Sequence, residues 1–526
     1  MNLTPRKQSG AALIAFLLVF VTAASFALLK RINEVATKQH RDAQTVKALA
    51  EAKAALIGYA AGANIIPTGL CGSNCPRPGD LPCPDRDDDG LAGWGTSVPL
   101  PPPSCGNASG TTGGCLGVPG SCRRLGRLPW KTLGLPDLRD GDGERLWYAV
   151  SNNFKNNIRT SCTAGECLNS DRRGTLTVQA TNGALIHDGT NPDAWTPSGA
   201  VAVVLAPGRV LRRQGASSDQ DRSCTGGSCD TNGKCITSPP TNTPKCNPQN
   251  YLDTVTGDDN ATFGDNTLDG FIQGDVIDTN GEEIVNDRLL AITYQDLMPL
   301  LEKRVVGEVL ICLREYAAPA PNNGRYPWAA KLDPAAAPDY DDDNGERFGR
   351  LPDGQSPIFP GSVTLDDTKT AMGGTAWNYW PNKDILPSSA CKLTSNVSPN
   401  TWWLNWKEVV FYSVAGGFQP AQPAAGPPGC GPPPNNCLTV DSLAQEVVVI
   451  AAGKRLQAAA SVPSGQPRTD TDPITRNAYK ADVRNYLEDD NSDYLDDGIV
   501  TPNEDVFTSK AVSDTFNDVV CKQGIC

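Results

Sequence analysis

Histidine and methionine are almost missing from this chain of 526 residues, which contains two of the first and three of the second. The two histidines, His40 and His187, leave very little for catalysis through imidazole. The sequence also lacks a Gly-x-Ser-x-Gly nucleophile elbow, a phosphate-binding loop and a His-Glu-x-x-His zinc segment. We therefore expect no enzymatic activity and assign no catalytic residue. A glycosidase pair of carboxylates stays open, because acidic residues are plentiful and sequence spacing does not give their separation in space.

Positive charge is in deficit, with 46 basic residues against 59 acidic ones and a net charge of -13. This balance disfavours a nucleic-acid or anionic-lipid surface on the folded part, so we expect no nucleic-acid partner and regard cations as better partners. The 51 glycines and 43 prolines argue against a helical bundle and predict a loop-rich protein that contains β-structure. The length suggests two large units or roughly three ordinary ones.

Cysteine, by contrast, is abundant, with 18 residues that run from Cys71 to Cys526. All of them follow the first hydrophobic segment. So many thiols beside so little histidine indicate an oxidising compartment, where cysteines form disulfides instead of holding zinc. We expect everything beyond the hydrophobic segment to lie outside the cytoplasm.

The first hydrophobic segment, residues 11–29, carries no charge and is just long enough to span a bilayer. Basic residues flank it on both sides. Neither glycine nor proline occurs from residue 11 to residue 57, so one helix of about 70 Å, at 1.5 Å per residue, can run from the membrane into the folded part. Its second half is polar with one apolar face, which is typical of a stalk that packs on a domain.

Residues 6–14, Arg-Lys-Gln-Ser-Gly-Ala-Ala-Leu-Ile, resemble the leader of type IV pilins and pseudopilins. The resemblance implies that a prepilin peptidase cuts between Gly10 and Ala11, that the new terminus is methylated, and that the helix stays in the inner membrane. It also implies other pilin-like subunits as partners, with the folded part in the periplasm or in an extracellular filament. The family's usual glutamate at the fifth mature position is Ala15 here, which favours a minor subunit at or near a filament tip.

The alternative for this terminus is a signal anchor that is never cleaved. The protein would then be a membrane-anchored adhesin or carbohydrate-binding protein, with an aromatic cluster as its binding face. Packing in a core or between subunits is the other explanation for that cluster. The cluster comprises Trp377, Tyr379, Trp380, Trp402, Trp403 and Trp406.

The rest of the chain contains an internal repeat, because similar segments occur twice in the same order. The matching pairs are residues 59–61 and 316–318, 85–90 and 339–345, 126–129 and 349–352, 144–154 and 408–418, 203–209 and 448–454, and 250–252 and 485–487. Leu301, Val305, Val309 and Cys312 follow helical spacing and predict a second, soluble copy of the lower stalk. The predicted units are a leader at 1–10, a transmembrane and stalk helix at 11–46, module 1 at 47–296 and module 2 at 297–526.

Cysteine parity agrees with these modules, since module 1 has twelve cysteines and module 2 has six. Disulfide connectivity cannot be deduced from spacing, but near neighbours are the simplest candidates. They are Cys162 with Cys167, Cys430 with Cys437, and Cys521 with Cys526. Four further cysteines at 224, 229, 235 and 246 have zinc binding as an alternative.

Acidic loops are the candidate metal sites. Asp85, Asp87 and Asp89 alternate before Gly90, as carboxylates do where they converge on calcium, but Thr96 at the twelfth position excludes a complete EF-hand. Pseudopilins often hold calcium in a late loop, so the resemblance implies calcium as a cofactor; a solvated acidic turn is the alternative. The full set of candidate ligands is Asp85, Asp87, Asp89, Asp339, Asp341, Asp343, Asp493, Asp497 and Glu504.

These features predict an α+β fold, in which a long N-terminal helix carries two tandem, disulfide-rich, pilin-like headpieces. Each headpiece is expected to be a helix packed on an antiparallel sheet. The expected function is assembly, as a minor subunit of a type IV pilus or of a type II secretion filament, with the membrane helices packed against each other.

Overall fold

The computed structural model places most of the chain. It describes residues 9–62, 77–93, 124–151, 154–155, 167–190, 198–212, 218–224, 229–231, 233–235, 244–255, 258–261, 270–318, 323–334, 340, 345–352, 402–420, 427–431, 437–456, 465–468, 472–493, 505–513 and 515–521. The fold is mixed α+β, with one long apolar helix at the N terminus and several antiparallel sheets, as the sequence predicts.

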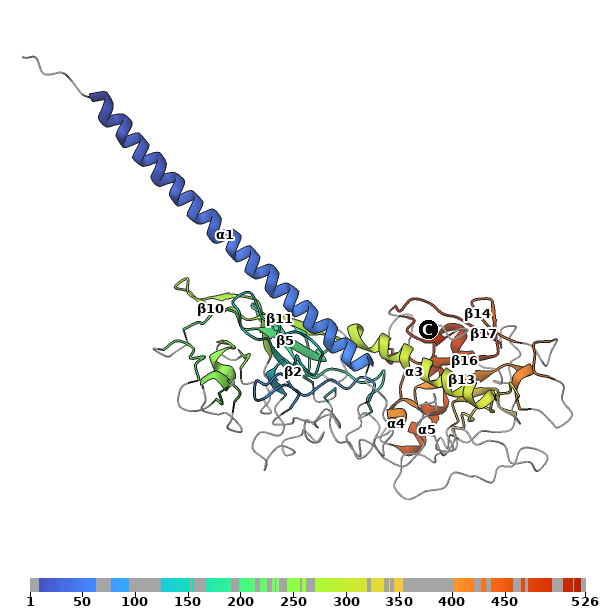
Figure 1. Ribbon diagram of the computed structural model, residues 1–526. Helices are drawn as coiled ribbons and strands as arrows, with labels where there is room; N and C mark the ends of the chain where they lie inside the picture. Colours follow the sequence, from blue (N-terminus) through green and yellow to red (C-terminus); the bar gives the residue numbers. More distant parts are fainter. Residues whose placement is uncertain are drawn as a thin grey trace, which may run out of the picture.

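Helix α1 (Ser9–Gly62) is continuous over 54 residues. Its first half is exposed and projects away from the rest of the molecule (Figure 1). Burial begins in the second half, where Ala48, Leu49, Ala52 and Leu56 recur at helical spacing and pack on the first sheet. Full burial of a leucine side chain stabilises the fold by about 1.5–3 kcal/mol, so this stripe fixes the helix on the sheet.

Two four-stranded sheets form the framework, and both are antiparallel throughout. The first has the order β1-β2-β5-β11 and the second β12-β13-β16-β18. Their bounds are β1 Leu125–Arg127, β2 Trp147–Val150, β5 Ala202–Ala206 and β11 Arg288–Ile292, then β12 Phe348–Arg350, β13 Val410–Val414, β16 Val447–Ala451 and β18 Val519–Cys521.

The two sheets have the same register at the segments that repeat in the sequence. Tyr148 lies opposite Val204 in the first sheet, and Tyr412 lies opposite Val449 in the second. The two tyrosine hydroxyls donate to the carbonyls of Pro82 and Pro327, at 3.3 and 3.0 Å. Each module therefore holds its central strand pair in the same way.

The glycine of each Gly-Arg-Leu-Pro segment lies where the backbone of another segment passes close to the sheet edge. A Cβ atom on Gly126 would lie 2.5 Å from the carbonyl oxygen of Asp85, and one on Gly349 would lie 2.0 Å from that of Ala330. No larger residue fits there without moving the backbone. The repeated glycine thus has a structural cause.

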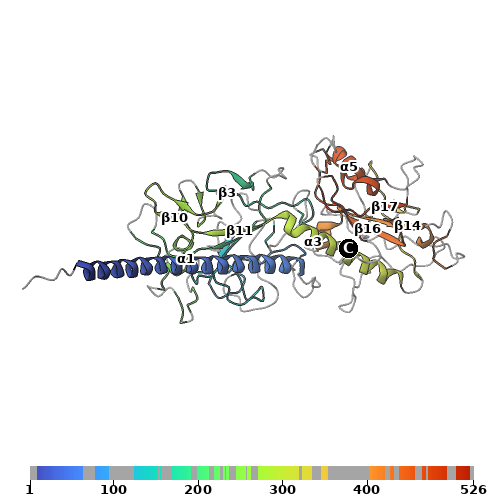
Figure 2. The ribbon, with the colours of Figure 1, turned by 90° about the horizontal axis from the view of Figure 1, so that it is seen from above.

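Helix α3 (Tyr294–Ala317) lies against the second sheet, as α1 lies against the first. It starts at a capping box, in which Thr293 and Asp296 bond to each other's backbone N–H groups. Its buried face includes Leu301, Val305 and Val309, as the spacing predicts. The start of α3 also contacts the end of α1, and Figure 2 shows the two modules one beyond the other along the direction of α1.

Smaller elements complete each module. A three-stranded sheet of order β4-β3-β8 accompanies the first and one of order β15-β14-β17 the second; each contains one parallel pair, which the sequence did not predict. The bounds are β3 Val178–Ala180, β4 Leu185–His187, β8 Phe271–Gln273, β14 Leu438–Val440, β15 Leu443–Gln445 and β17 Val506–Phe507, with hairpins β6 Thr254–Val255 and β7 Asp258–Asp259, and β9 Val276–Ile277 and β10 Glu283–Val285. The short helices are α4 Trp402–Trp406, α5 Pro473–Ala481, η2 Pro244–Cys246, η3 Pro248–Asn250, η4 Gly416–Phe418, η5 Val483–Asn485 and η6 Asp489–Ser492.

One hydrophobic core joins the two modules. It runs from the lower half of α1 through the inner face of the first sheet to α3, the second sheet and α4. A separate core lies on the other face of the first sheet, around Trp147 and Tyr251. The modules are consequently not independent units on a flexible linker.

Candidate functional site

The N-terminal half of α1 is the first candidate. Among the described residues, α1 is long and apolar enough to cross a membrane. Phe16 is 76% exposed and Phe20 is 68% exposed. The predicted cut between Gly10 and Ala11 falls within this helix, and Ala15 lies on its exposed part. The structure thus presents a long apolar helix whose large side chains from Leu13 to Leu29 are more than half exposed.

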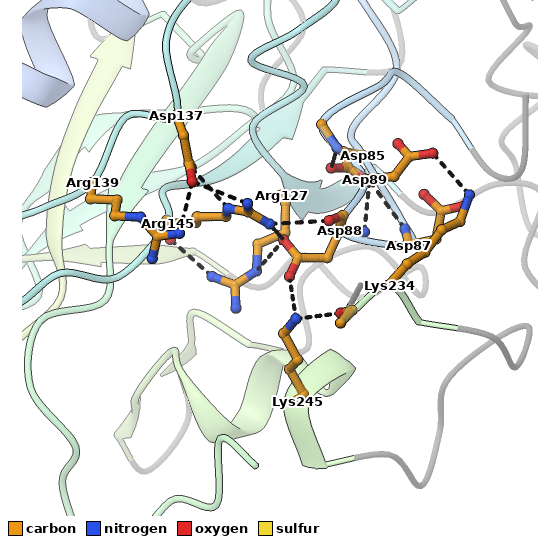
Figure 3. Close-up of polar contacts among 12 residues, drawn as sticks. Asp85, Asp87, Asp88, Asp89, Arg127, Asp137, Arg139, Arg145, Lys234 and Lys245 are labelled. Atoms are coloured by element: carbon orange, nitrogen blue, oxygen red, sulfur yellow. Dashed lines mark hydrogen bonds and ion pairs between the residues drawn. The ribbon is translucent and has the colours of Figure 1, made fainter. Parts of the chain in front are cut away.

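The acidic loop at residues 85–90 is the second candidate, and Asp85 determines its shape (Figure 3). The carboxylate of Asp85 accepts hydrogen bonds from the backbone N–H groups of Asp87, Asp88 and Gly90, at 3.1, 2.9 and 2.7 Å. Backbone bonds to Arg127 tie the same residue to strand β1. Burial raises the pKa of Asp85, and the neighbouring carboxylates add to the rise. Asp85 therefore acts as the internal support of a tight turn.

The other two predicted ligands of this loop contact a lysine from a distant segment. Asp85, Asp87 and Asp89 bring carboxylate oxygens within 4.8 Å of one another, the arrangement that could hold a metal ion. The ammonium of Lys234 lies 2.8 Å from Asp87 and 2.9 Å from Asp89. Hydrogen bonds to Asp87 and then to Asp89 raise the pKa of Lys234. A metal ion at this place would have to displace that ammonium group.

Asp88, between them in sequence, has a separate set of cations. Arg145 lies 2.9 Å from its carboxylate, Lys245 lies 3.0 Å away and Arg127 lies 4.0 Å away. Burial alone would raise the pKa of Asp88, but these three positive charges outweigh it and hold the pKa below its ordinary value. Arg145 also pairs with Asp137 at 2.8 Å, so the loop belongs to a network of alternating charges (Figure 3).

Sequence reasoning missed all four of these cations, because they come from other segments of the chain. The available signals were Arg127, in the repeated Gly-Arg-Leu-Pro segment, and Arg145, in the repeated segment 144–154.

Most of the other predicted metal ligands cannot be placed. Asp339, Asp341, Asp343, Asp497 and Glu504 lie outside the residues that the structure describes, while Asp493 directly follows η6. The position that corresponds to Asp85 in module 2 is that of Ala330, because Ala330 pairs with Arg350 as Asp85 pairs with Arg127. At this position module 2 therefore has no carboxylate.

A buried polar network lies beneath the first sheet and was not predicted as a site. Gln220 donates to the Asp253 carboxylate at 2.8 Å, and Arg222 donates to the Gln220 side-chain oxygen at 2.9 Å. The Asp287 carboxylate accepts from the backbone N–H of Asp253 at 2.7 Å and from the Asn260 amide at 3.1 Å. Asp253 and Asp287 are thus held side by side in the interior.

Module 2 contains the same network at corresponding positions. Gln466 donates to the Glu488 carboxylate at 2.8 Å, and Arg468 donates to the Gln466 oxygen at 3.2 Å. The Asp518 carboxylate accepts from the backbone N–H of Glu488 and from the Asn491 amide, both at 3.0 Å. The guanidinium groups of Arg222 and Arg468 also bond equivalent carbonyls, those of Gly208 and Gly453.

Each network brings two buried carboxyl groups together beside one arginine. Burial, opposed by hydrogen bonds, raises the pKa of Asp253 to about 6, and burial together with the Asp253 charge raises that of Asp287 well above its usual range. Burial likewise raises the pKa values of Glu488 and Asp518. Backbone N–H groups and side-chain amides donate hydrogen bonds to both pairs.

No known protein family, curated protein or solved structure matches this chain. Its function has to be inferred from its own residues.

The described part of the chain contains disulfide bonds in both modules. Cys430 and Cys437, a predicted near pair, are bonded. Cys224 is bonded to Cys229, so these two do not act as zinc thiolates. Cys167 and Cys521 are also in disulfides, while their predicted partners, Cys162 and Cys526, lie outside the described residues. No cysteine among the described residues is free.

Half of the aromatic cluster belongs to the core. Trp402, Trp403 and Trp406 form the short helix α4, and none of them is more than 3% exposed. They cannot meet a sugar or a protein partner without unfolding of the core. Trp377, Tyr379 and Trp380 lie outside the described residues.

Proposed function

We propose that this protein is an envelope-anchored, extracytoplasmic filament subunit of the type IV pilin and pseudopilin kind. One observation carries the proposal: a single helix has an exposed apolar first half and a second half packed on an antiparallel sheet. Such a helix suits a protein that stands in a membrane and then enters a helical stack of like subunits. Its role is assembly.

Burial of the exposed half of α1 in an apolar environment is favoured in free energy. The large apolar side chains from Leu13 to Leu29 are more than half exposed, and full burial of each is worth about 1.5–3 kcal/mol. A bilayer supplies that burial before assembly, and the helices of neighbouring subunits supply it in a filament. The disulfides of both modules support an extracytoplasmic place for the folded part.

A minor position in the filament is the more specific part of the proposal. In the family that the leader resembles, a carboxylate at the fifth mature position pairs with the terminal amine of a neighbour in apolar surroundings, where an unpaired charge is costly. Ala15 has no such group. Two modules around a shared core also make a large head, which is easier to place at a filament tip than at every repeat.

Processing tests the proposal directly. In cells with an active prepilin peptidase, the membrane-extracted chain is expected to begin at Ala11, after loss of ten residues. N-terminal sequencing and intact mass measure this. Gly10→Val should stay uncut, and Ser9→Ala, the matched control next to it, should be cut normally. A wild-type chain that begins at Met1 would contradict the pilin assignment, and one cut beyond Leu29 would indicate an ordinary secretory signal.

A further inference from the structure

A groove separates α1 from module 1 just below the exposed apolar half of the helix. Its volume is about 940 Å³. One wall is a single face of α1, from Phe26 to Thr45, and the other includes Gly208, Asp275 and Arg288. Hairpin β9–β10 forms part of the second wall, and Figure 1 shows β10 beneath the middle of α1.

Ion pairs satisfy the charges at the end of the groove nearest the core. Arg41 of α1 lies 3.1 Å from Asp142, and Asp42 lies 2.9 Å from Arg288, so both pairs join the two walls. Gln44 adds a hydrogen bond to the carbonyl of Asp140, at 2.9 Å. These contacts close that end of the groove.

Four charged side chains remain in the part of the groove nearer the apolar half of α1. Lys30, Glu34 and Lys38 recur every four residues along the helix, and Asp275 faces them from module 1. None of the four has an ion-pair partner among the residues that the structure describes. Farther along the same helix, at the same spacing, Lys47 and Glu51 do pair, at 3.7 Å.

The position of these charges relates them to a membrane surface. The uncharged run of α1 ends at Leu29, so Lys30 is the first charge beyond the hydrophobic core of a bilayer. Phe26 and Leu29 line the groove at that end. Lys30 and Glu34 lie about 6 Å apart along the helix axis, at 1.5 Å per residue. The ammonium of Lys30 and the carboxylate of Glu34 thus lie one after the other along the helix, at the level where lipid head groups begin.

We propose that this groove binds the head group of a phospholipid with a primary ammonium, as in phosphatidylethanolamine. Lys30 meets the phosphate, Glu34 and Asp275 meet the ammonium, and Lys38 balances the second carboxylate. The acyl chains lie along Phe26, Leu29 and the exposed helix above them. This inference rests on the membrane anchoring in the proposed function.

The balance of charges selects this head group over others. Two lysines and two carboxylates have no net charge, so they match a zwitterion better than an anionic lipid, which would leave one carboxylate without a positive partner. A quaternary ammonium, as in phosphatidylcholine, has no N–H to donate to a carboxylate, whereas charge-assisted hydrogen bonds are the stronger kind.

Native mass spectrometry of the full-length chain tests this assignment. The protein is released from mixed micelles that contain equal amounts of phosphatidylethanolamine, phosphatidylcholine and phosphatidylglycerol, and the retained lipids are counted. Phosphatidylethanolamine is expected to be retained preferentially. Lys30→Gln and Glu34→Gln should each lower its retention about tenfold, the loss of one charge-assisted contact. Lys47→Gln and Glu51→Gln, on the same helix but outside the groove, should have no effect.

The possible failures are distinguishable. Equal retention of the three lipids, or preference for phosphatidylglycerol, would overturn the head-group site and leave membrane anchoring intact. A photo-crosslinker at Thr37 that captures a second copy of the chain instead of lipid would show that the groove is a subunit contact. A chain that needs no detergent and retains no lipid would overturn the anchor and this site together.

Discussion

The acid pair of module 1 makes a quantitative prediction about stability and pH. The pKa of Asp253 is raised from 3.8 to about 6, chiefly by burial. A raised folded-state pKa means that the folded chain keeps a proton that the unfolded chain has already lost. Stability is therefore fully present below the unfolded value and falls as pH rises toward the folded value. A shift of about two units at 1.36 kcal/mol each corresponds to a loss of about 3 kcal/mol between about pH 4 and about pH 6.

The perturbation that isolates this effect is Asp287→Asn. The Asp287 oxygen Oδ2 accepts two hydrogen bonds, which an amide oxygen can keep, while Oδ1 is buried without a hydrogen-bond partner among the described residues. An amide there removes the second acidic group at little cost in shape. Burial and the Asp253 charge raise the pKa of Asp287, so the folded chain also keeps this second proton after the unfolded chain has lost it. Without this second acidic group, the fall in stability above about pH 4 should become shallower. Asp219→Asn, an exposed carboxyl next to Gln220, is the control.

The assay is urea unfolding of the detergent-solubilised chain across this pH range, followed by tryptophan fluorescence. Carboxyls with lowered pKa values, such as Asp88 and Asp137, contribute in the opposite direction but only as pH falls below about 4, so the two effects separate. A wild-type free energy of unfolding that rises from about pH 4 to about pH 6 would refute the reasoning. An unchanged slope in Asp287→Asn would refute the role given to the pair.

Two further predictions concern the acidic loop and the core. Calcium should raise the Tm of Lys234→Met, relative to chelator, by more than it raises the Tm of wild type, because the ion no longer competes with an ammonium for Asp87 and Asp89. Lys303→Met, an exposed control, should behave as wild type. Equal Tm shifts in wild type and both variants would leave the loop without a calcium role. Trp403→Ala should lower the free energy of unfolding by about 3–5 kcal/mol in denaturant titrations. Leu443→Ala, at a half-exposed strand position, should stay within about 1 kcal/mol of wild type. A small effect of Trp403→Ala would argue against the buried position of α4.

Local patterns predicted helices α1 and α3 well. The absence of glycine and proline from residue 11 to residue 57 is a property of the local sequence, and α1 follows from it. The spacing of Leu301, Val305 and Val309 gave α3 in the same way. The repeat also placed segments 144–154 and 408–418 correctly, because each keeps its partner strand. Its pairing of 85–90 with 339–345 was wrong, since Ala330 occupies the position of Asp85.

Contacts between distant segments were not predictable in this way. Lys234 reaches Asp87 and Asp89 from a segment about 145 residues away, and nothing in its local sequence marks it. The Gln-x-Arg segments at 220–222 and 466–468 bond the repeated Asn-Tyr-Leu segments at 250–252 and 485–487, but two short polar matches are too weak to notice without the fold. For the same reason the parallel pairs β3–β8 and β14–β17 appear only in three dimensions.

The shared core determines how tension applied to the N-terminal half of α1 would be transmitted through the molecule. Tension along α1 first loads β5 and β11, which its lower half contacts, and then α3, which leads into the second sheet. Arg468 of module 2 holds Asp171 of module 1 at 2.9 Å, so the second module bears part of the same load. A head built on a flexible linker would yield at the linker, whereas this one has to break core packing and a partly buried ion pair before its two halves separate. The molecule is therefore built to resist extension as one mechanical body.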